Sequence, residues 1–164
     1  MRPVLIPGNS VAAALTSRTD AQLPQASLEL VHSRAPMLGE ALPLAAVDWA
    51  TALVAAALPE RQPYPRLYDA FAGFLDAVEA AQSASGWGGA LARFELLMVA
   101  ELGYGEPDVR LPRLAGSPRP EWSAILSALE MSGRTLFGEI LGGRTRSLED
   151  SRERLLGRLR RMAG

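Results

Sequence analysis

Arginine is the residue type in this sequence that is best suited to specific chemistry. All seventeen basic residues are Arg and none is Lys. A planar guanidinium matches the geometry of phosphate oxygens, so this composition is suited to phosphate recognition. A GC-rich genome, in which Arg codons replace Lys codons, explains the same bias. Composition alone does not separate the two explanations.

The residue types that the sequence lacks exclude several other kinds of functional site. There is no Cys, so a disulfide framework, a zinc ribbon and a thiol nucleophile are excluded. His32 is the single histidine, which argues against a His-based triad or metal site, and we expect it to be a partly buried, hydrogen-bonded residue. Glu95 and Glu101 are six residues apart and share no helical face for acid–base work. We therefore expect no enzyme activity, no cofactor and no metal.

The charge is unevenly distributed along the chain. The formal net charge of −1 hides an acidic middle and a basic final third. Residues 37–109 carry three Arg against ten acidic residues, whereas residues 110–164 carry eleven Arg against six acidic residues. Nucleic-acid binding, if present, is expected at the two ends of the chain. The candidate phosphate-binding residues are Arg2, Arg18, Arg34, Arg152, Arg154, Arg158 and Arg161.

Each of these arginines also has a simpler explanation. For the first three, ordinary surface charge is the favoured explanation, because three arginines provide few phosphate contacts. The C-terminal run is equally consistent with a solvated helix face that carries local pairs such as Asp150–Arg154. The sequence leaves both alternatives open.

The first 35 residues are predicted to be β structure. Residues 10–16 form a candidate strand after a Pro-Gly-Asn turn, and residues 27–32 alternate, with Leu28, Leu30 and His32 on one face. Two or three strands are too few for an independent sheet, so they must pack on something else.

From residue 36 the apolar period changes to that of helices. The first helix, from Pro43, is expected to bury Leu44, Val47, Thr51, Val54 and Leu58. The last is expected to start at Ser147 as N-cap and to bury Leu148, Leu155, Leu159 and Met162. Residues 106–120, rich in Pro and Arg, form a linker or surface loop. The predicted helices are 43–58, 64–81, 87–102, 121–141 and one from 147 onward.

The predicted fold class is α+β and mainly α, with a short β segment followed by a bundle of about five helices. No apolar run is long enough to cross a bilayer, and the N-terminal residues lack the apolar core of a signal peptide. We therefore expect a cytoplasmic protein.

The three tryptophans, Trp49, Trp87 and Trp122, are expected in the core or at an interface, with base stacking as the alternative for one of them.

Three stretches of the sequence, taken in order, form a recognisable pattern. They are Leu5–Val11, then Leu28–Arg34 continuing through Ala55–Glu60 to Tyr64–Tyr68, and finally Arg93–Leu97 followed by Ala100–Gly105. In their order and spacing they resemble the RecO family of bacterial DNA repair and recombination mediators. The resemblance implies a partial OB-fold-like β segment at residues 1–35 and a RecO-like helical domain at residues 36–164. It also implies a bacterial, nucleoid-associated protein.

The resemblance implies a function as well. RecO proteins bind single-stranded DNA and the acidic tail of single-strand-binding protein, partner RecR, help to load RecA and anneal strands. The resemblance implies that Arg93 binds the acidic tail of single-strand-binding protein. The alternative role for Arg93 is a salt bridge to Glu95 or Glu101 within the bundle. A helical protein-interaction or dimerisation module that has lost DNA binding is the competing function, and an enzyme is the weakest.

This sequence departs from the family pattern in three places. The barrel of the family begins well before the Pro7-Gly8 turn, so we expect most of its first strands to be absent. The segment before Pro120 is shorter than usual, and no Cys remains for the zinc site of some members. A truncated, internally deleted or atypical member is therefore expected.

Overall fold

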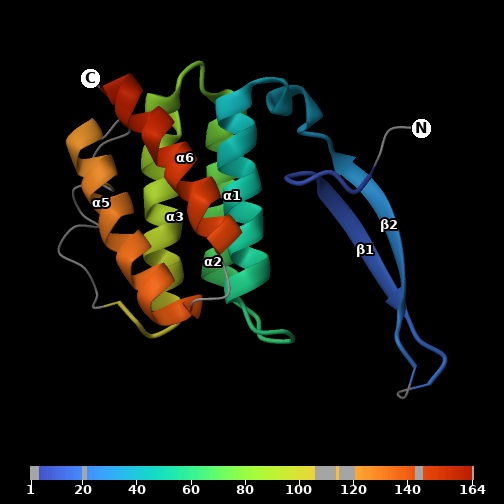
Figure 1. The fold of residues 1–164 in the computed structure, drawn as a ribbon. Helices are drawn as coiled ribbons and strands as arrows, with labels where there is room; N and C mark the ends of the chain where they lie inside the picture. Colours follow the sequence, from blue (N-terminus) through green and yellow to red (C-terminus); the bar gives the residue numbers. More distant parts are fainter. Residues whose placement is uncertain (1–3, 20–21, 106–113, 115–120, 143–145, 164) are drawn as a thin grey trace.

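The computed structural model describes residues 4–19, 22–105, 114, 121–142 and 146–163. In this part of the chain an antiparallel hairpin precedes five α-helices (Figure 1), which confirms the predicted mainly α class. None of these helices has the length and apolar character that a membrane crossing requires. The helices are α1 (Ala41–Ala57), α2 (Pro65–Ala80), α3 (Gly88–Glu101), α5 (Trp122–Thr135) and α6 (Arg146–Ala163).

The hairpin consists of β1 (Ser10–Thr16) and β2 (Gln25–His32). Both predicted strands are confirmed, and β2 begins two residues earlier than expected. Leu28 and Leu30 pair with Ala13 and Val11 across the hairpin, so these side chains share one apolar face. Leu28 and Leu30 are half-buried, and most of the remaining hairpin residues are exposed. This two-stranded sheet depends on the helices for its position.

Arg34 joins the base of the hairpin to α2. Its buried guanidinium donates to the Gly8 carbonyl and the Ser10 hydroxyl, each at 3.0 Å. On the other side it pairs with Asp76 and, at 3.3 Å from Nε to Oε2, with Glu79. Arg34 therefore links two segments that are more than 40 residues apart in the sequence.

His32 lies beside this link but is not buried. Its Nε2 is 2.9 Å from both carboxylate oxygens of Glu79, and half of its side-chain surface is exposed. The prediction of a hydrogen-bond partner for His32 is confirmed, and the other half of its side-chain surface is covered.

Aromatic side chains fill the core between α2 and α3. Phe74 stacks on Phe94 with ring centroids 6.4 Å apart and meets Trp87 edge-on at the same distance. Trp49 and Trp87 are each only 1% exposed, while Trp122 is half-buried. Base stacking is thus unavailable to Trp49 and Trp87, and the prediction that they belong to the core is confirmed.

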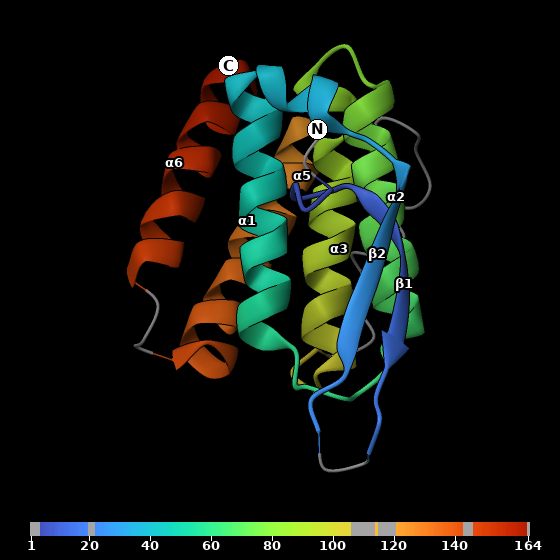
Figure 2. The same cartoon turned by 90° about the vertical axis from the view of Figure 1, so that its right-hand side faces the viewer.

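The helices α1 and α6 lie side by side (Figure 2). The buried face of α1 differs from the predicted one, because Thr51, Val54 and Leu58 are only half-buried or at its margin. Small side chains allow the neighbouring helices to come close on a different face. The buried residues of α1 are Ala46, Val47, Trp49, Ala50 and Leu53.

Two helix boundaries also differ from the prediction. The helix expected over 121–141 ends as an α-helix at Thr135 and continues as one wider π-helical turn over Leu136–Ile140. The last helix begins at Arg146, so Ser147 lies in its first turn and is not its N-cap. Met162 is 54% exposed and does not continue the buried stripe of that helix. Residues 106–120 lie outside the described part of the chain except for Leu114.

Candidate nucleic-acid interface

The two halves of the helix α6 differ in charge. Its acidic residues, Glu149, Asp150 and Glu153, all lie in the first half beside three arginines, whereas the only charged residues of the second half are Arg158, Arg160 and Arg161. Carboxylates near the N-terminus and guanidinium groups near the C-terminus both stabilise the helix dipole. Because Leu155, Leu156 and Leu159 are buried against the bundle, the exposed arginines of α6 lie on its outer side.

Arg154, Arg158 and Arg161 form an exposed basic face, which we call the α6 arginine face. Their spacing of four and then three residues places them on one side of the helix. Together with Gly157 and two acidic residues they line an open hollow of about 610 Å³. This face is where the structure brings three of the predicted phosphate-binding residues together.

Two arginines of the α6 arginine face are held by neutral oxygens. Arg154 donates to the Ser151 hydroxyl at 3.1 Å, and Arg158 donates to the Ala41 carbonyl of α1 at 3.2 Å. Within the described residues, none of the three arginines forms an ion pair, and the expected Asp150–Arg154 pair is not made. Their positive charge is therefore available to an external anion.

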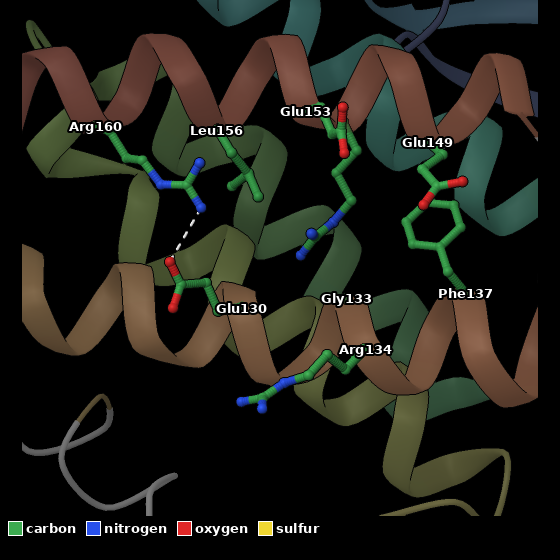
Figure 3. A pocket seen from close by; sticks show the side chains of 9 residues that line it. Glu130, Gly133, Arg134, Phe137, Glu149, Glu153, Leu156 and Arg160 are labelled. Carbon is green, nitrogen blue, oxygen red and sulfur yellow. Dashed lines mark hydrogen bonds and ion pairs between the residues drawn. The ribbon is translucent and has the colours of Figure 1, made fainter.

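The neighbouring groove between α5 and α6 is different in character. Figure 3 shows that Glu130 faces Arg160 across it, and the two side chains pair at 3.0 Å. Arg134 is on the α5 side of the groove, while Glu149 and Glu153 project from α6 (Figure 3). Three acidic residues balance three arginines in the lining of this groove, whereas arginines outnumber acidic residues by three to two at the α6 arginine face, so the groove is the weaker anion site.

Arg152 was predicted to contact phosphate, but it lies in the core. It is 5% exposed, and its Nη2 is 2.6 Å from Oε2 of Glu95, which is 0% exposed. The guanidinium also donates to the Leu129 carbonyl and lies 5.5 Å from the ring centroid of Trp49. We therefore exclude Arg152 from the interface and call Trp49, Glu95, Ser132 and Arg152 the buried polar network.

A sequence signal for this burial exists. Arg152 is four residues after Leu148 and three before Leu155, so it lies on the apolar stripe of α6 and not opposite to it. The partner Glu95 is 57 residues away in the sequence, so no local pattern identifies it.

The three N-terminal arginines are separated by the fold. Arg34 is buried and ion-paired to α2, so it is not available to a phosphate in this structure. Arg18 is exposed in the loop of the hairpin. Arg2 lies outside the described residues. Only Arg18 therefore remains as an exposed candidate in the described part of the β segment.

Arg93 is half-buried on α3. Its Nη1 donates to the Leu114 carbonyl at 2.7 Å, and burial lowers the pKa of its guanidinium, which stays charged at neutral pH. The two alternative partners are occupied elsewhere, because Glu95 binds Arg152 and Glu101 binds Arg66 at 2.8 Å. The described residues thus hold Arg93 by a neutral oxygen.

The helical part of the chain is similar to known proteins. Residues 41–109 match a family model described as "Recombination protein O C terminal". A protein of Rhodospirillum rubrum named DNA repair protein RecO is 30% identical over 207 aligned positions, which cover 98% of this chain and 80% of that protein. The chain belongs to the RecO family. This confirms the resemblance inferred from the sequence.

Other RecO proteins match a shorter stretch. The DNA repair protein RecO of Rhodospirillum centenum is 43% identical over 106 residues, or 64% of this chain and 41% of that protein. That of Paracoccus denitrificans is 39% identical over 102 residues, or 62% and 41%. The match therefore spans about two fifths of these RecO proteins. No solved structure matches the chain.

Proposed function

We propose that this RecO family chain is a recombination mediator of the RecF pathway that binds single-stranded DNA through the α6 arginine face. The observation that carries the proposal is the exposure of Arg154, Arg158 and Arg161 on one helical side, without ion pairs among the described residues. Guanidinium groups in such an arrangement bind backbone phosphates without reading sequence. Arg18 is proposed as an additional contact, and Arg2 stays a prediction.

The wider role follows from family membership and is proposed as well. It consists of binding single-strand-binding protein and RecR, assisting RecA loading and annealing strands, without catalytic turnover. We further propose that residues 1–35 are part of an OB-fold-like unit and that residues 36–164 are a separate helical domain. The half-buried Leu28 and Leu30 of the hairpin support the first part, since an apolar sheet face requires a cover.

The DNA-binding test replaces all three arginines of the α6 arginine face by Ala. Loss of about three phosphate contacts is expected to reduce the slope of log affinity against log salt concentration by about 2, because each contact to single strands contributes about 0.7. Fluorescence anisotropy of a labelled oligonucleotide at several salt concentrations measures this slope.

Arg160→Ala is the control, because Arg160 lies on the same helix but is paired with Glu130. An unchanged salt slope in the triple variant would contradict the proposed interface. Absence of any DNA binding by the unaltered chain would contradict DNA binding altogether.

Arg93 is proposed as the contact for the acidic tail of single-strand-binding protein. Arg93→Ala is expected to weaken the binding of an acidic C-terminal tail peptide by about tenfold to a hundredfold, since a charged hydrogen bond contributes about 1.5–3 kcal/mol. Isothermal titration calorimetry measures this affinity. Arg66→Ala is the matched control, because Arg66 is exposed and paired with Glu101. Equal affinities of the two variants would exclude this role for Arg93.

The alternative function is a helical interaction module that has lost DNA binding. It is favoured by the exposed apolar side chains of the N-terminal segment, where Leu5, Leu15, Leu23 and Val31 are each more than 60% exposed. Such a surface is typical of a site that a partner covers. Retained binding of the tail peptide or RecR, with no DNA binding at low salt, would establish the alternative.

A further inference from the structure

A second hollow lies between α1 and α6, next to the α6 arginine face. Its volume is about 330 Å³, at the low end of the range of small-molecule sites. The α1 side is formed by Ala45, Asp48 and Ala52, which are three and four residues apart and thus on one face of the helix. Leu148 and Leu155 of α6 form apolar walls. We call this hollow the α1–α6 notch, and its width depends on the two alanines.

Two arginines belong to both hollows. Arg154 and Arg158 line the α1–α6 notch and also the open hollow of the α6 arginine face. A phosphate held by these guanidinium groups would therefore lie at the rim of the notch. A nucleotide places its base within a few bonds of its phosphate, so the base of such a nucleotide would reach the apolar walls.

Asp48 gives the notch a polar edge. The carboxylate is exposed, and among the described residues it forms no ion pair with Arg154 or Arg158. An ionised carboxylate only accepts hydrogen bonds. It therefore favours a base edge with an exocyclic amino group, such as that of cytosine, and disfavours a carbonyl at the same place.

We infer that the α1–α6 notch binds one unstacked nucleobase of single-stranded DNA, with a preference for bases that carry an exocyclic amino group. This inference rests on the proposed function, since Arg154 and Arg158 must first hold the phosphate. Contacts between the base and the notch add to the DNA affinity that the phosphate contacts of the arginines provide. Trp49 also lines the notch, but only with its margin, because its ring is buried against Phe137 and Arg152.

The test compares three oligonucleotides of equal length: oligo-dC, oligo-dU and an abasic oligomer with the same phosphates. The unaltered chain is expected to bind oligo-dC about fivefold more tightly than the abasic oligomer, because a base leaves water in the notch. Ala52→Leu fills the notch and is expected to remove this difference while leaving the abasic affinity unchanged. Ala55→Leu is the matched control, because Ala55 is exposed on the same helix and does not line the notch.

Asp48→Asn tests the polar edge. An amide both donates and accepts, so the preference for oligo-dC over oligo-dU is expected to disappear. If Ala52→Leu perturbs the circular dichroism spectrum, Ala45→Leu fills the same notch from a position seven residues, or about two helical turns, earlier in α1. An unchanged ratio of oligo-dC to abasic affinity in folded Ala52→Leu or Ala45→Leu would overturn the inference but leave phosphate binding intact. Failure of all three oligomers to bind the unaltered chain would overturn the proposed function with it.

Discussion

Glu95→Gln is expected to lower the free energy of unfolding by about 3–5 kcal/mol. Glu95 is 0% exposed and accepts hydrogen bonds from three side chains: Trp49 Nε1 at 2.7 Å, Ser132 Oγ at 2.5 Å and Arg152 Nη2 at 2.6 Å. Glutamine keeps the volume but leaves the Arg152 guanidinium buried without a counter-charge. Urea unfolding followed by circular dichroism measures the change.

Glu101→Gln, on the same helix, is the control. Glu101 pairs with Arg66, whose side chain is 73% exposed, so loss of this pair is expected to change the free energy of unfolding by only about 0–1 kcal/mol. The double variant Glu95→Gln/Arg152→Met removes both charges and is expected to recover most of the loss. If Glu95→Gln and Glu101→Gln lower the free energy of unfolding by equal amounts, the buried Glu95–Arg152 pair is no more important for stability than the exposed Glu101–Arg66 pair.

The helices and strands of this fold could be predicted from local sequence patterns. The buried face of a helix could be predicted only where apolar residues are confined to one side of it. In α2, Leu67, Phe74 and Val78 are seven and four residues apart, which is the spacing of one helical face, and all three are buried. The helix α1 is apolar on nearly all sides, and its buried face includes the small residues Ala46 and Ala50. A pattern of large apolar residues cannot identify a face where small residues allow close packing.

The arginines show the same limit at the candidate site. Residue type alone gave Arg34, Arg152 and Arg154 the same predicted role, but the first two are buried and ion-paired. Their partners Asp76 and Glu95 are 42 and 57 residues away in the sequence. Only the packed structure separates an arginine that links two elements from one that is available to a ligand.

The buried polar network explains why α6 carries its free arginines in a fixed position. Arg152 anchors the helix to α3 through Glu95 and to α5 through the Leu129 carbonyl. The α6 arginine face begins two residues later, on the opposite side of the same helix. A rigid helix presents the guanidinium groups without the ordering cost that a flexible loop would incur on binding. Stability and proposed binding therefore depend on neighbouring residues of one helix.

Gly133→Ala is expected to lower the free energy of unfolding by about 2–4 kcal/mol. Gly133 lies inside α5, where Ala normally stabilises a helix by about 1 kcal/mol relative to Gly. Here an added Cβ would overlap Nη1 of Arg152 and lie 2.8 Å from its Cζ. The guanidinium cannot withdraw without breaking its pair with Glu95, so steric overlap outweighs helix propensity. Thermal unfolding measures the sign and size of the change.

Gly73→Ala is the matched control, because Gly73 lies inside α2 with no atom within 4 Å of an added Cβ. It is expected to stabilise the protein by about 0.5–1 kcal/mol. In the Glu95→Gln/Arg152→Met background the guanidinium is gone, so Gly133→Ala is also expected to become neutral or stabilising. This reversal of sign measures the coupling between Gly133 and Arg152 directly. If Gly133→Ala is equally destabilising in both backgrounds, overlap with the Arg152 guanidinium is not the reason that glycine is required at position 133.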